Sequence, residues 1–308
     1  MLRILFLVMK TQRADLDRLY DGIAATCDCE LRRLDSDQQR NLKRYFKDID
    51  CSDYDHVMIM LRNKKVMKQA RFLRKIPNLV FLEHDAWQNY TDHKYKGKFS
   101  RLYRKLPGAI VISSGCTVAR KLRDEGIDAR FVPKGYDQAL LSDLGKQRDI
   151  EAAFVGSVKN SAYQDRAAFL SELVRRGEVQ ILRTESGDEY LQALNRIRFF
   201  ISADIRFGEY MLKNFEAMAC GCVLFAYDQG EEENQALGFK DMENLVLYRD
   251  VDELLEKLQT VQRDPELADR IRRAGQSLVA ERFRFDLIGR DVVRALEATT
   301  TSGKGTPR

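Results

Sequence analysis

Glu216 stands in a local pattern that suits the binding of a phosphorylated ligand. It lies inside a short helical stretch between two apolar runs of strand length, residues 199–205 and 222–227. The stretch ends at Cys220-Gly221, where glycine can take the left-handed conformation that closes many helices. A helix that follows a buried strand directs its first N–H groups toward the crevice beyond the strand ends, which favours a diphosphate. The spacing alone is equally consistent with a packed crossover that has one surface carboxylate.

Phosphate binding also needs cations and an approachable backbone, and a second segment offers both. Residues 151–155 are typical of a strand, and Gly156 and Ser157 follow it, where a glycine lets a ligand come close to the backbone. Lys159 and Arg166 come next and can neutralise phosphate charge. A lone Gly-Ser turn after a strand is weak evidence for a phosphate site. It gains value from its expected position opposite the Glu216 segment.

A third group has the residue types for proton handling. His84 and Asp85 follow an apolar strand pattern over residues 79–82, at the carboxyl end where open α/β sheets place their ligands. Histidine has an unperturbed pKa suited to proton transfer near neutral pH. We therefore expect His84 and Asp85 to orient a reacting hydroxyl. In the structural alternative, His84 ends the strand and bonds only to backbone.

The segment FEAMACGCVLFA, residues 215–226, closely resembles the donor-site motif of retaining glycosyltransferases with the GT-B fold, which often reads E-x7-E-A-M-A-x-G-x-P-V. The resemblance implies that Glu216 bonds the ribose of a nucleotide-sugar. Lys213 and Asn214 fit the shorter form R/K-x-F-E-x-x-A-C-G of a divergent bacterial branch, and Lys213 is a second phosphate candidate or else a surface residue near a helix start. The first glutamate of the motif falls on Gly208, with Glu209 one place later as the donor-site candidate.

Positive charge is concentrated in the first half of the chain. Residues 1–145 contain 28 Lys and Arg against 19 Asp and Glu, a net charge of +9, whereas the remainder has a net charge of −4. Basic stretches with interleaved apolar residues, as in 62–75 and 94–106, suit an anionic membrane surface or the phosphates of an acceptor. A solvated helix face is the structural alternative, and nucleic acid is disfavoured because no recognised nucleic-acid motif accompanies the charge. The cations assigned to this acceptor or membrane surface are Arg62, Lys64, Lys65, Lys68, Lys96, Lys98 and Arg101.

Strand and helix patterns alternate along the chain, which predicts an α/β protein with parallel sheets in two Rossmann-like units. Helical patterns in the first unit include residues 38–46 and 64–74. At 308 residues the chain is long enough for two domains. The resemblance implies that these domains face a cleft and that the last helix crosses back to the first domain. The expected parts are an acceptor-binding domain over 1–146, a nucleotide-sugar-binding domain over 147–284, the crossover helix over 285–298 and a disordered tail over 299–308.

Composition points to a cytoplasmic protein without a metal centre. Six cysteines occur without a CxxC spacing, and there are only three histidines, so we expect reduced thiols and no metal site. The longest apolar run, residues 4–9, is too short to span a bilayer, and the N-terminus does not read as a secretory signal. The expected location is the cytoplasm, with peripheral attachment to the inner face of the membrane as an option.

Together these features predict a metal-independent glycosyltransferase that moves a sugar from a nucleotide-sugar donor to a glycan or lipid-linked acceptor and needs no cofactor. The resemblance further implies retention at the sugar and a role in bacterial envelope or surface polysaccharide synthesis, such as that of lipopolysaccharide. Two alternatives stay open, a catalytically silent homologue that binds a nucleotide-sugar or a partner, and a nucleotide-sugar epimerase. Gly208, and Lys10-Thr11 in place of a Gly-rich loop after the first strand, keep the silent homologue in consideration.

Overall fold

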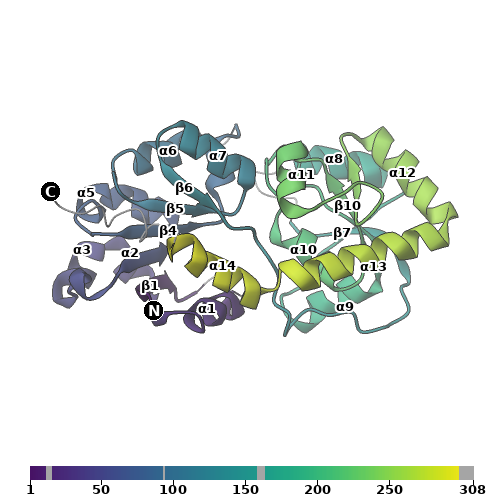
Figure 1. Ribbon diagram of the computed structural model, residues 1–308. Coiled ribbons are helices and arrows are strands. Elements are labelled where there is room, and N and C mark those ends of the chain that lie inside the picture. The colour runs from purple at the N-terminus through teal and green to yellow at the C-terminus, as the bar shows by residue number, and fades with distance from the viewer. Residues whose placement is uncertain (12–15, 93, 158–163, 298–308) are drawn as a thin grey trace. The chain divides into compact units, whose positions relative to one another are not determined.

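The computed structural model describes residues 1–11, 16–92, 94–157 and 164–297 (Figure 1). It contains two compact units. The first comprises Met1–Pro133 and the chain from Phe285 on, and the second comprises Lys134–Arg284. Each unit has its own parallel sheet with helices packed against it.

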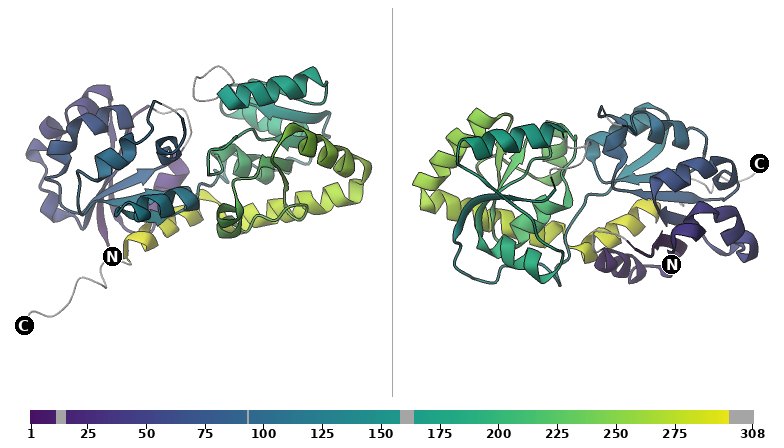
Figure 2. Two further views of the ribbon diagram at one scale, coloured as in Figure 1. Left: turned by 90° about the horizontal axis from the view of Figure 1, so that it is seen from above. Right: turned by 180° about the vertical axis from the view of Figure 1, so that it is seen from behind.

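The inner strands of the first unit are almost continuous apolar runs. In the described residues its sheet has six parallel strands in the order β2-β1-β3-β4-β5-β6. Helices cover both faces (Figures 1 and 2), and the inner strand β1 accordingly contains an apolar run, with every residue from Ile4 to Val8 fully buried. The strands are β1 Arg3–Met9, β2 Asp28–Leu34, β3 His56–Met60, β4 Leu79–Glu83, β5 Ile110–Ser113 and β6 Asp128–Phe131.

Two of the helices expected in this unit are interrupted. The predicted helix over 38–46 is replaced by α2 (Ser36–Arg40) and α3 (Leu42–Tyr45), because Asn41 leaves the helical conformation and its side chain accepts a hydrogen bond from the Arg44 N–H. The predicted helix over 64–74 is similarly divided by Gln69, whose side chain bonds to the backbone of residues 39 and 42. The resulting helices are α4 Asn63–Val66 and α5 Ala70–Leu73, and the other helices of this unit before its last are α1 Asp17–Ala24, α6 Lys98–Tyr103 and α7 Cys116–Asp124.

The C-terminal helix α14, Phe285–Glu297, packs on α1 within the first unit. Two glycines allow this approach. A Cβ atom added at Gly289 would lie 2.4 Å from the backbone carbon of Gly22, and one added at Gly22 would lie 2.7 Å from the carbonyl oxygen of Phe285. The helix expected over 285–298 therefore completes the core of the first unit, while the expected tail lies outside the described residues.

The second unit repeats the same design with five strands in the described residues. They are parallel and follow the order β11-β10-β9-β7-β8. The strands are β7 Ile150–Val155, β8 Gln180–Leu182, β9 Ile197–Ile201, β10 Val223–Tyr227 and β11 Val246–Tyr248. The helices are α8 Gln164–Arg175, α9 Asp188–Arg196, α10 Leu212–Ala219, α11 Glu231–Leu237, α12 Val251–Arg263 and α13 Pro265–Arg282.

Both sheets place their first strand between the second and the third. In a doubly wound sheet of this order, the chain reverses its direction of travel between the first and third strands, and ligands bind beyond the carboxyl ends there. The expected ligand positions are therefore the carboxyl ends of β1 and β3 in the first unit and of β7 and β9 in the second. In the described part of the chain, none of the helices combines the length and apolar character that a membrane crossing needs.

The units divide between Pro133 and Lys134 rather than after residue 146, where the sequence pattern suggested a boundary. The connecting segment packs with the second unit because its polar groups find partners there. Leu144 donates its N–H to Asn195 at 2.7 Å, and the Arg148 guanidinium donates to the carbonyls of Ile197 and Cys220, each at 2.6 Å. These bonds hold the segment against the end of α9, the start of β9 and the end of α10.

Gly289→Ala tests the contact between α1 and α14. We expect the free energy of unfolding to fall by about 1–3 kcal/mol, because the new methyl group overlaps backbone atoms of α1. If the helices did not pack this closely, alanine would instead stabilise an exposed helical position by about 1 kcal/mol. Chemical denaturation measures the sign, and Arg290→Ala on the same helix, where the side chain is half exposed, serves as the control.

Candidate functional site

In the second unit, Glu216 on α10 lies beside Tyr190 of α9. The Tyr190 hydroxyl donates to Oε2 of Glu216 at 2.6 Å, and Glu216 is half-buried. Burial raises the pKa of Glu216, while the Tyr190 hydrogen bond and the Lys213 charge oppose that shift. Within the described residues Oε1 of Glu216 makes no hydrogen bond, so this oxygen is left to accept from a ligand. Tyr190 was not expected, because the pattern of α9 gave no sign of a helix facing α10.

Lys213 lies one turn before Glu216 and reaches the end of β7. Its Nζ donates to the carbonyl oxygen of Val155 at 2.5 Å and stands 5.3 Å from the centre of the Tyr190 ring. Gly156 makes this approach possible, because a Cβ atom there would lie 3.0 Å from the lysine Nζ and from the Phe154 ring. Burial lowers the pKa of Lys213, so an anion beside it would restore the favourable environment of its charge.

A further cation stands at the end of the neighbouring strand β8. The Arg183 guanidinium donates to Oγ of Ser157 at 3.3 Å and is otherwise exposed. Its positive charge contributes to the lowered pKa of Lys213. Arg183 was not among the expected site residues, although its place after a strand was a signal for it. Lys159 lies outside the described residues.

Two of the expected donor-site residues have their side chains engaged inside the unit. Arg166 donates Nη2 to Oδ1 of Asp204 at 2.7 Å and Nε to the carbonyl of Ala203 at 2.9 Å, and it is buried. Asn214 is also buried, and its Nδ2 donates to the other oxygen of Asp204 at 2.7 Å. Arg166 therefore holds α8, and Asn214 holds the start of α10, against the segment that follows β9. A direct contact of either with a donor stays a prediction.

Glu209 likewise has an internal partner. Its carboxylate lies 2.9 Å from Nζ of Lys134, and the two side chains are 1% and 3% exposed. Gly208, which occupies the position of the motif's first glutamate, has a φ of +72° and donates its N–H to Gln229 at 2.8 Å. The ion pair joins the start of the second unit to the loop before α10. A donor contact of Glu209 remains a prediction beside this role.

In the first unit, β4 ends in a buried carboxylate. Glu83 is 5% exposed and accepts hydrogen bonds from the Asp85 N–H at 2.9 Å, the Tyr103 hydroxyl at 3.1 Å and the Asn63 amide at 3.3 Å. Burial, assisted by the charge of Asp85, raises its pKa to about 7. His84 is half-buried and Asp85 is exposed. Glu83 was overlooked as a site residue because it reads as the last residue of an apolar strand.

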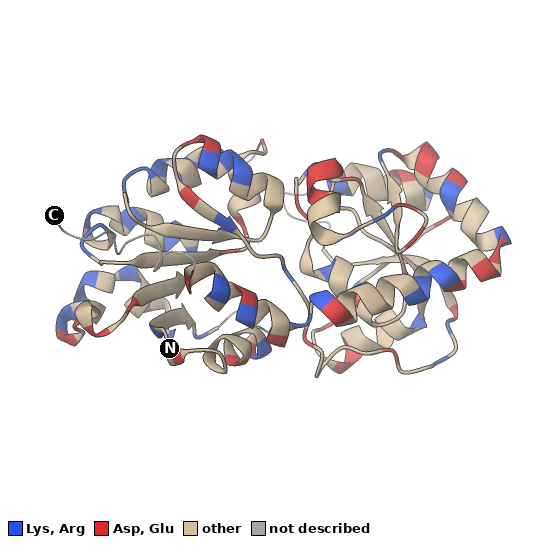
Figure 3. Cartoon of the chain, in the orientation of Figure 1, with Lys and Arg blue, Asp and Glu red and all other residues tan. Residues whose placement is uncertain are grey.

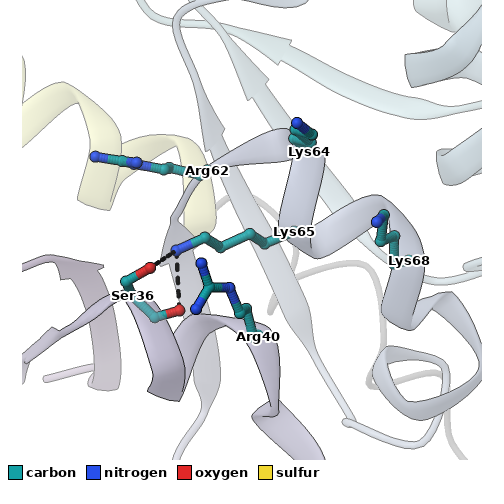
Figure 4. Close-up of a pocket in the computed structure, with 6 residues that line it drawn as sticks. All are labelled: Ser36, Arg40, Arg62, Lys64, Lys65 and Lys68. Atoms are coloured by element: carbon teal, nitrogen blue, oxygen red, sulfur yellow. Dashed lines mark hydrogen bonds between the residues drawn. The ribbon is translucent and has the colours of Figure 1, made fainter.

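The basic residues expected at an acceptor surface fall into two places. Arg62, Lys64, Lys65 and Lys68 line a pocket with Ser36 and Arg40 (Figure 4). Lys98 and Arg101 belong to α6 and Lys96 just precedes it, and all three are exposed outside that pocket. Figure 3 shows blue Lys and Arg segments along the helices that follow β2 and β3.

The described residues contain no group of three or more His, Cys, Asp or Glu side chains placed to hold a metal ion. The expectation that the protein works without a metal is not tested by this finding. The six cysteines are free thiols, with Cys27, Cys220 and Cys222 buried and the other three partly exposed.

Known proteins share this architecture. The family model for glycosyl transferase-like proteins matches residues 130–290, more than half of the chain. The Anabaena protein HepE, solved with UDP-glucose, is similar with a TM-score of 0.70 and 14% identity over 97% of this chain and 100% of that one. Sucrose-phosphate synthase from Thermosynechococcus elongatus gives 0.67 and 14% over 98% and 100%, and the T4 phage glucosyltransferase BGT, solved with UDP and Mn2+, gives 0.60 and 11% over 96% and 99%.

No curated protein matches the chain in sequence. At these identities the solved structures are evidence of a shared fold, whereas the family match rests on the sequence itself. The chain belongs to the glycosyl transferase-like family and is a glycosyltransferase of the GT-B fold.

Proposed function

We propose that this protein transfers a sugar from a nucleotide-sugar to a hydroxyl group of a glycan or lipid-linked acceptor. The observation that carries the proposal is the position of Glu216 on α10, one turn after a lysine that reaches the Gly156 turn. At the carboxyl ends of β7 and β9, a carboxylate matches the ribose of a nucleoside diphosphate and the cations match its phosphates. The complexes of HepE with UDP and UDP-glucose support a donor of this class.

In this proposal Glu216 binds the ribose and the cations bind the diphosphate. Oε1, which makes no hydrogen bond among the described residues, and the tyrosine-bound Oε2 of Glu216 accept from two neighbouring ribose hydroxyls, while Lys213 and Arg183 offset the phosphate charge. Arg166, Asp204 and Asn214 hold α10 in place, so their contribution is positional.

The transfer breaks the bond between the anomeric carbon and the diphosphate oxygen and forms a bond from that carbon to the acceptor oxygen. The acceptor hydroxyl gives its proton to a phosphate oxygen of the departing nucleoside diphosphate, which takes the electron pair of the broken bond. We assign the first unit to the acceptor, with His84 and Asp85 orienting its hydroxyl and Glu83 accepting a hydrogen bond from the Asp85 N–H. Retention at the sugar, metal independence and a role in bacterial envelope polysaccharide synthesis are the finer parts of the proposal, and they rest on the motif resemblance.

Product analysis distinguishes the alternatives. Incubation with a nucleotide-sugar and an acceptor is expected to yield a free nucleoside diphosphate and a glycoside. An epimerase would instead give an isomeric donor, and a silent homologue would give neither. Comparison of turnover with and without EDTA tests metal independence in the same assay.

Glu216→Gln is expected to weaken nucleotide binding by roughly 10- to 100-fold, because it removes the charge from two hydrogen bonds to the ribose. A thermal-shift screen with UDP, GDP, ADP and CMP first identifies the nucleotide that stabilises the wild-type protein, and titration calorimetry then measures both affinities. Equal affinity of the two proteins would contradict the assignment of Glu216.

The 2′,3′-dideoxy form of the same nucleotide supplies a control for this measurement. It lacks the hydroxyls that Glu216 is proposed to bind, so the wild-type and Glu216→Gln proteins should bind it equally. A variant that lost affinity for the dideoxy form to the same extent would have a disturbed site rather than a lost ribose contact.

His84→Gln is expected to lower turnover by about 100-fold, within the range for a positioned proton-handling group, while nucleotide affinity stays unchanged. The separation follows from the places of the two residues, since His84 belongs to the first unit and Glu216 to the second. Release of free nucleotide from the nucleotide-sugar measures turnover. Near-normal turnover would remove His84 from the mechanism.

Glu83→Gln tests the buried carboxylate through the pH dependence of stability. The folded-state pKa of Glu83 is raised from 4.5 to about 7, so its contribution to the free energy of unfolding is complete below pH 4.5 and is lost as the pH rises to 7. Relative to wild type, the glutamine variant should therefore gain up to about 3 kcal/mol between pH 4.5 and pH 8. Urea denaturation at both pH values measures this difference, and a difference independent of pH would show that Glu83 is ionised throughout.

A further inference from the structure

A pocket of about 430 Å³ in the first unit is lined by five cations and a serine. The residues come from the two segments that follow β2 and β3, on either side of β1 in the sheet. Figure 4 shows Lys65 reaching Ser36, with the Arg40 side chain beside it. The lining residues are Ser36, Arg40, Arg62, Lys64, Lys65 and Lys68.

The cations of this pocket are only partly neutralised by the protein. Arg40 pairs with Asp37 at 2.6 Å, and Nζ of Lys65 donates to the hydroxyl and carbonyl oxygens of Ser36 at 2.7 and 2.9 Å. No carboxylate is among the lining residues. Burial lowers the pKa of Lys65 and the charges of Arg40 and Arg62 add to this shift, whereas the charges of Asp37 and Asp35 oppose it.

The lining of the pocket favours a compact, highly charged group over the surface of a lipid bilayer. Its lining side chains are all polar or charged, so it offers no apolar side chain for insertion among lipid tails. Two arginines and three lysines with one hydroxyl donor suit the several acceptor oxygens of a phosphate. A carboxylate would use only part of this donor set.

The pocket also lies at the place where this sheet is expected to bind ligands. Arg62 and α4 follow the carboxyl end of β3, next to β1, where the strand order reverses. The first residue of α4, Asn63, donates to Glu83 at 3.3 Å, and Glu83 accepts from the Asp85 N–H. The helix that supplies Lys64 and Lys65 is thus linked through Glu83 to Asp85, one of the two residues assigned to the acceptor hydroxyl.

We propose that this pocket binds a phosphate monoester or diphosphate group of the acceptor, and so fixes the acceptor's position for sugar transfer. The phosphate chemistry follows from the pocket, whereas its assignment to the acceptor rests on the proposed transferase function. A phosphorylated glycan and a lipid headgroup are the two sources of such a group.

The test compares two variants that each lose three exposed cations from the full-length protein. The pocket variant is Arg62→Gln/Lys64→Gln/Lys68→Gln, and the control is Lys96→Gln/Lys98→Gln/Arg101→Gln from the α6 region. Calorimetry at low salt measures binding of glucose 6-phosphate, and flotation measures binding to phosphatidylcholine vesicles that contain phosphatidic acid or phosphatidylglycerol. Nucleotide affinity is measured for every variant.

We expect the pocket variant to bind the phosphate monoester at least about 10-fold more weakly than wild type, and the control variant to stay within about twofold. Loss confined to glucose 6-phosphate assigns the group to a soluble or glycan phosphate, and loss confined to phosphatidic acid vesicles assigns it to a lipid headgroup. Unchanged nucleotide affinity in both variants keeps the donor site, and with it the proposed function, independent of this outcome.

Three results would overturn the proposal. Equal weakening in both variants would mean a general electrostatic attraction, as would equal binding of phosphatidylglycerol and phosphatidic acid vesicles. Loss of phosphate binding in Lys213→Gln, with retention in the pocket variant, would place the ligand at the donor site instead. Tight binding of duplex DNA that the pocket variant alone abolishes would make the pocket a nucleic-acid contact.

Discussion

The buried carboxylate of Asp204 is the constraint on which the donor side of this protein depends. It stands just beyond the carboxyl end of β9 and accepts hydrogen bonds from Arg166, Asn214 and the N–H of Met211, at 2.7, 2.7 and 3.2 Å. A buried charge is stable only when its partners are in place, and the loss of one typically costs 3–5 kcal/mol. Because these partners come from α8 and from the start of α10, satisfying one carboxylate also fixes the helix that bears Lys213 and Glu216.

The two units apply the same topological solution to different chemistry. In each, the strand order reverses beside the first strand, and cations gather at the carboxyl ends on that side. In the second unit they are few, and they stand near a carboxylate that accepts hydrogen bonds, an arrangement suited to a ligand with both charge and hydroxyl groups. In the first unit five cations line one pocket, and the described lining residues include no carboxylate. The fold therefore sets where ligands bind, and the loop residues set which ligands.

The sequence allowed the alternation of strands and helices to be predicted, because strands buried on both faces must be continuous apolar runs. Side-chain direction was not predictable in this way. Arg166 and Lys213 are both cations near strand ends, yet one is buried against Asp204 and the other reaches the Gly156 turn. Pairs distant in the sequence, such as Lys65 with Ser36, depend on how loops pack and leave no periodic signal. The pKa of Glu83 is raised by burial and by the charge of Asp85, and a strand pattern does not reveal how deeply one strand residue is buried.

The distribution of thiols gives each unit its own chemical reporter. The second unit contains only Cys220 and Cys222, both buried, and burial raises the pKa of each thiol, that of Cys222 to about 12. Thiolates are the species that react with alkylating reagents and oxidants, so these two cysteines do not react while the unit is folded. The first unit has the partly exposed Cys29, Cys51 and Cys116. The rate at which a thiol reagent modifies Cys220 and Cys222 therefore measures unfolding of the second unit. The partly exposed thiols of the first unit do not depend on that unfolding, and no added label is needed.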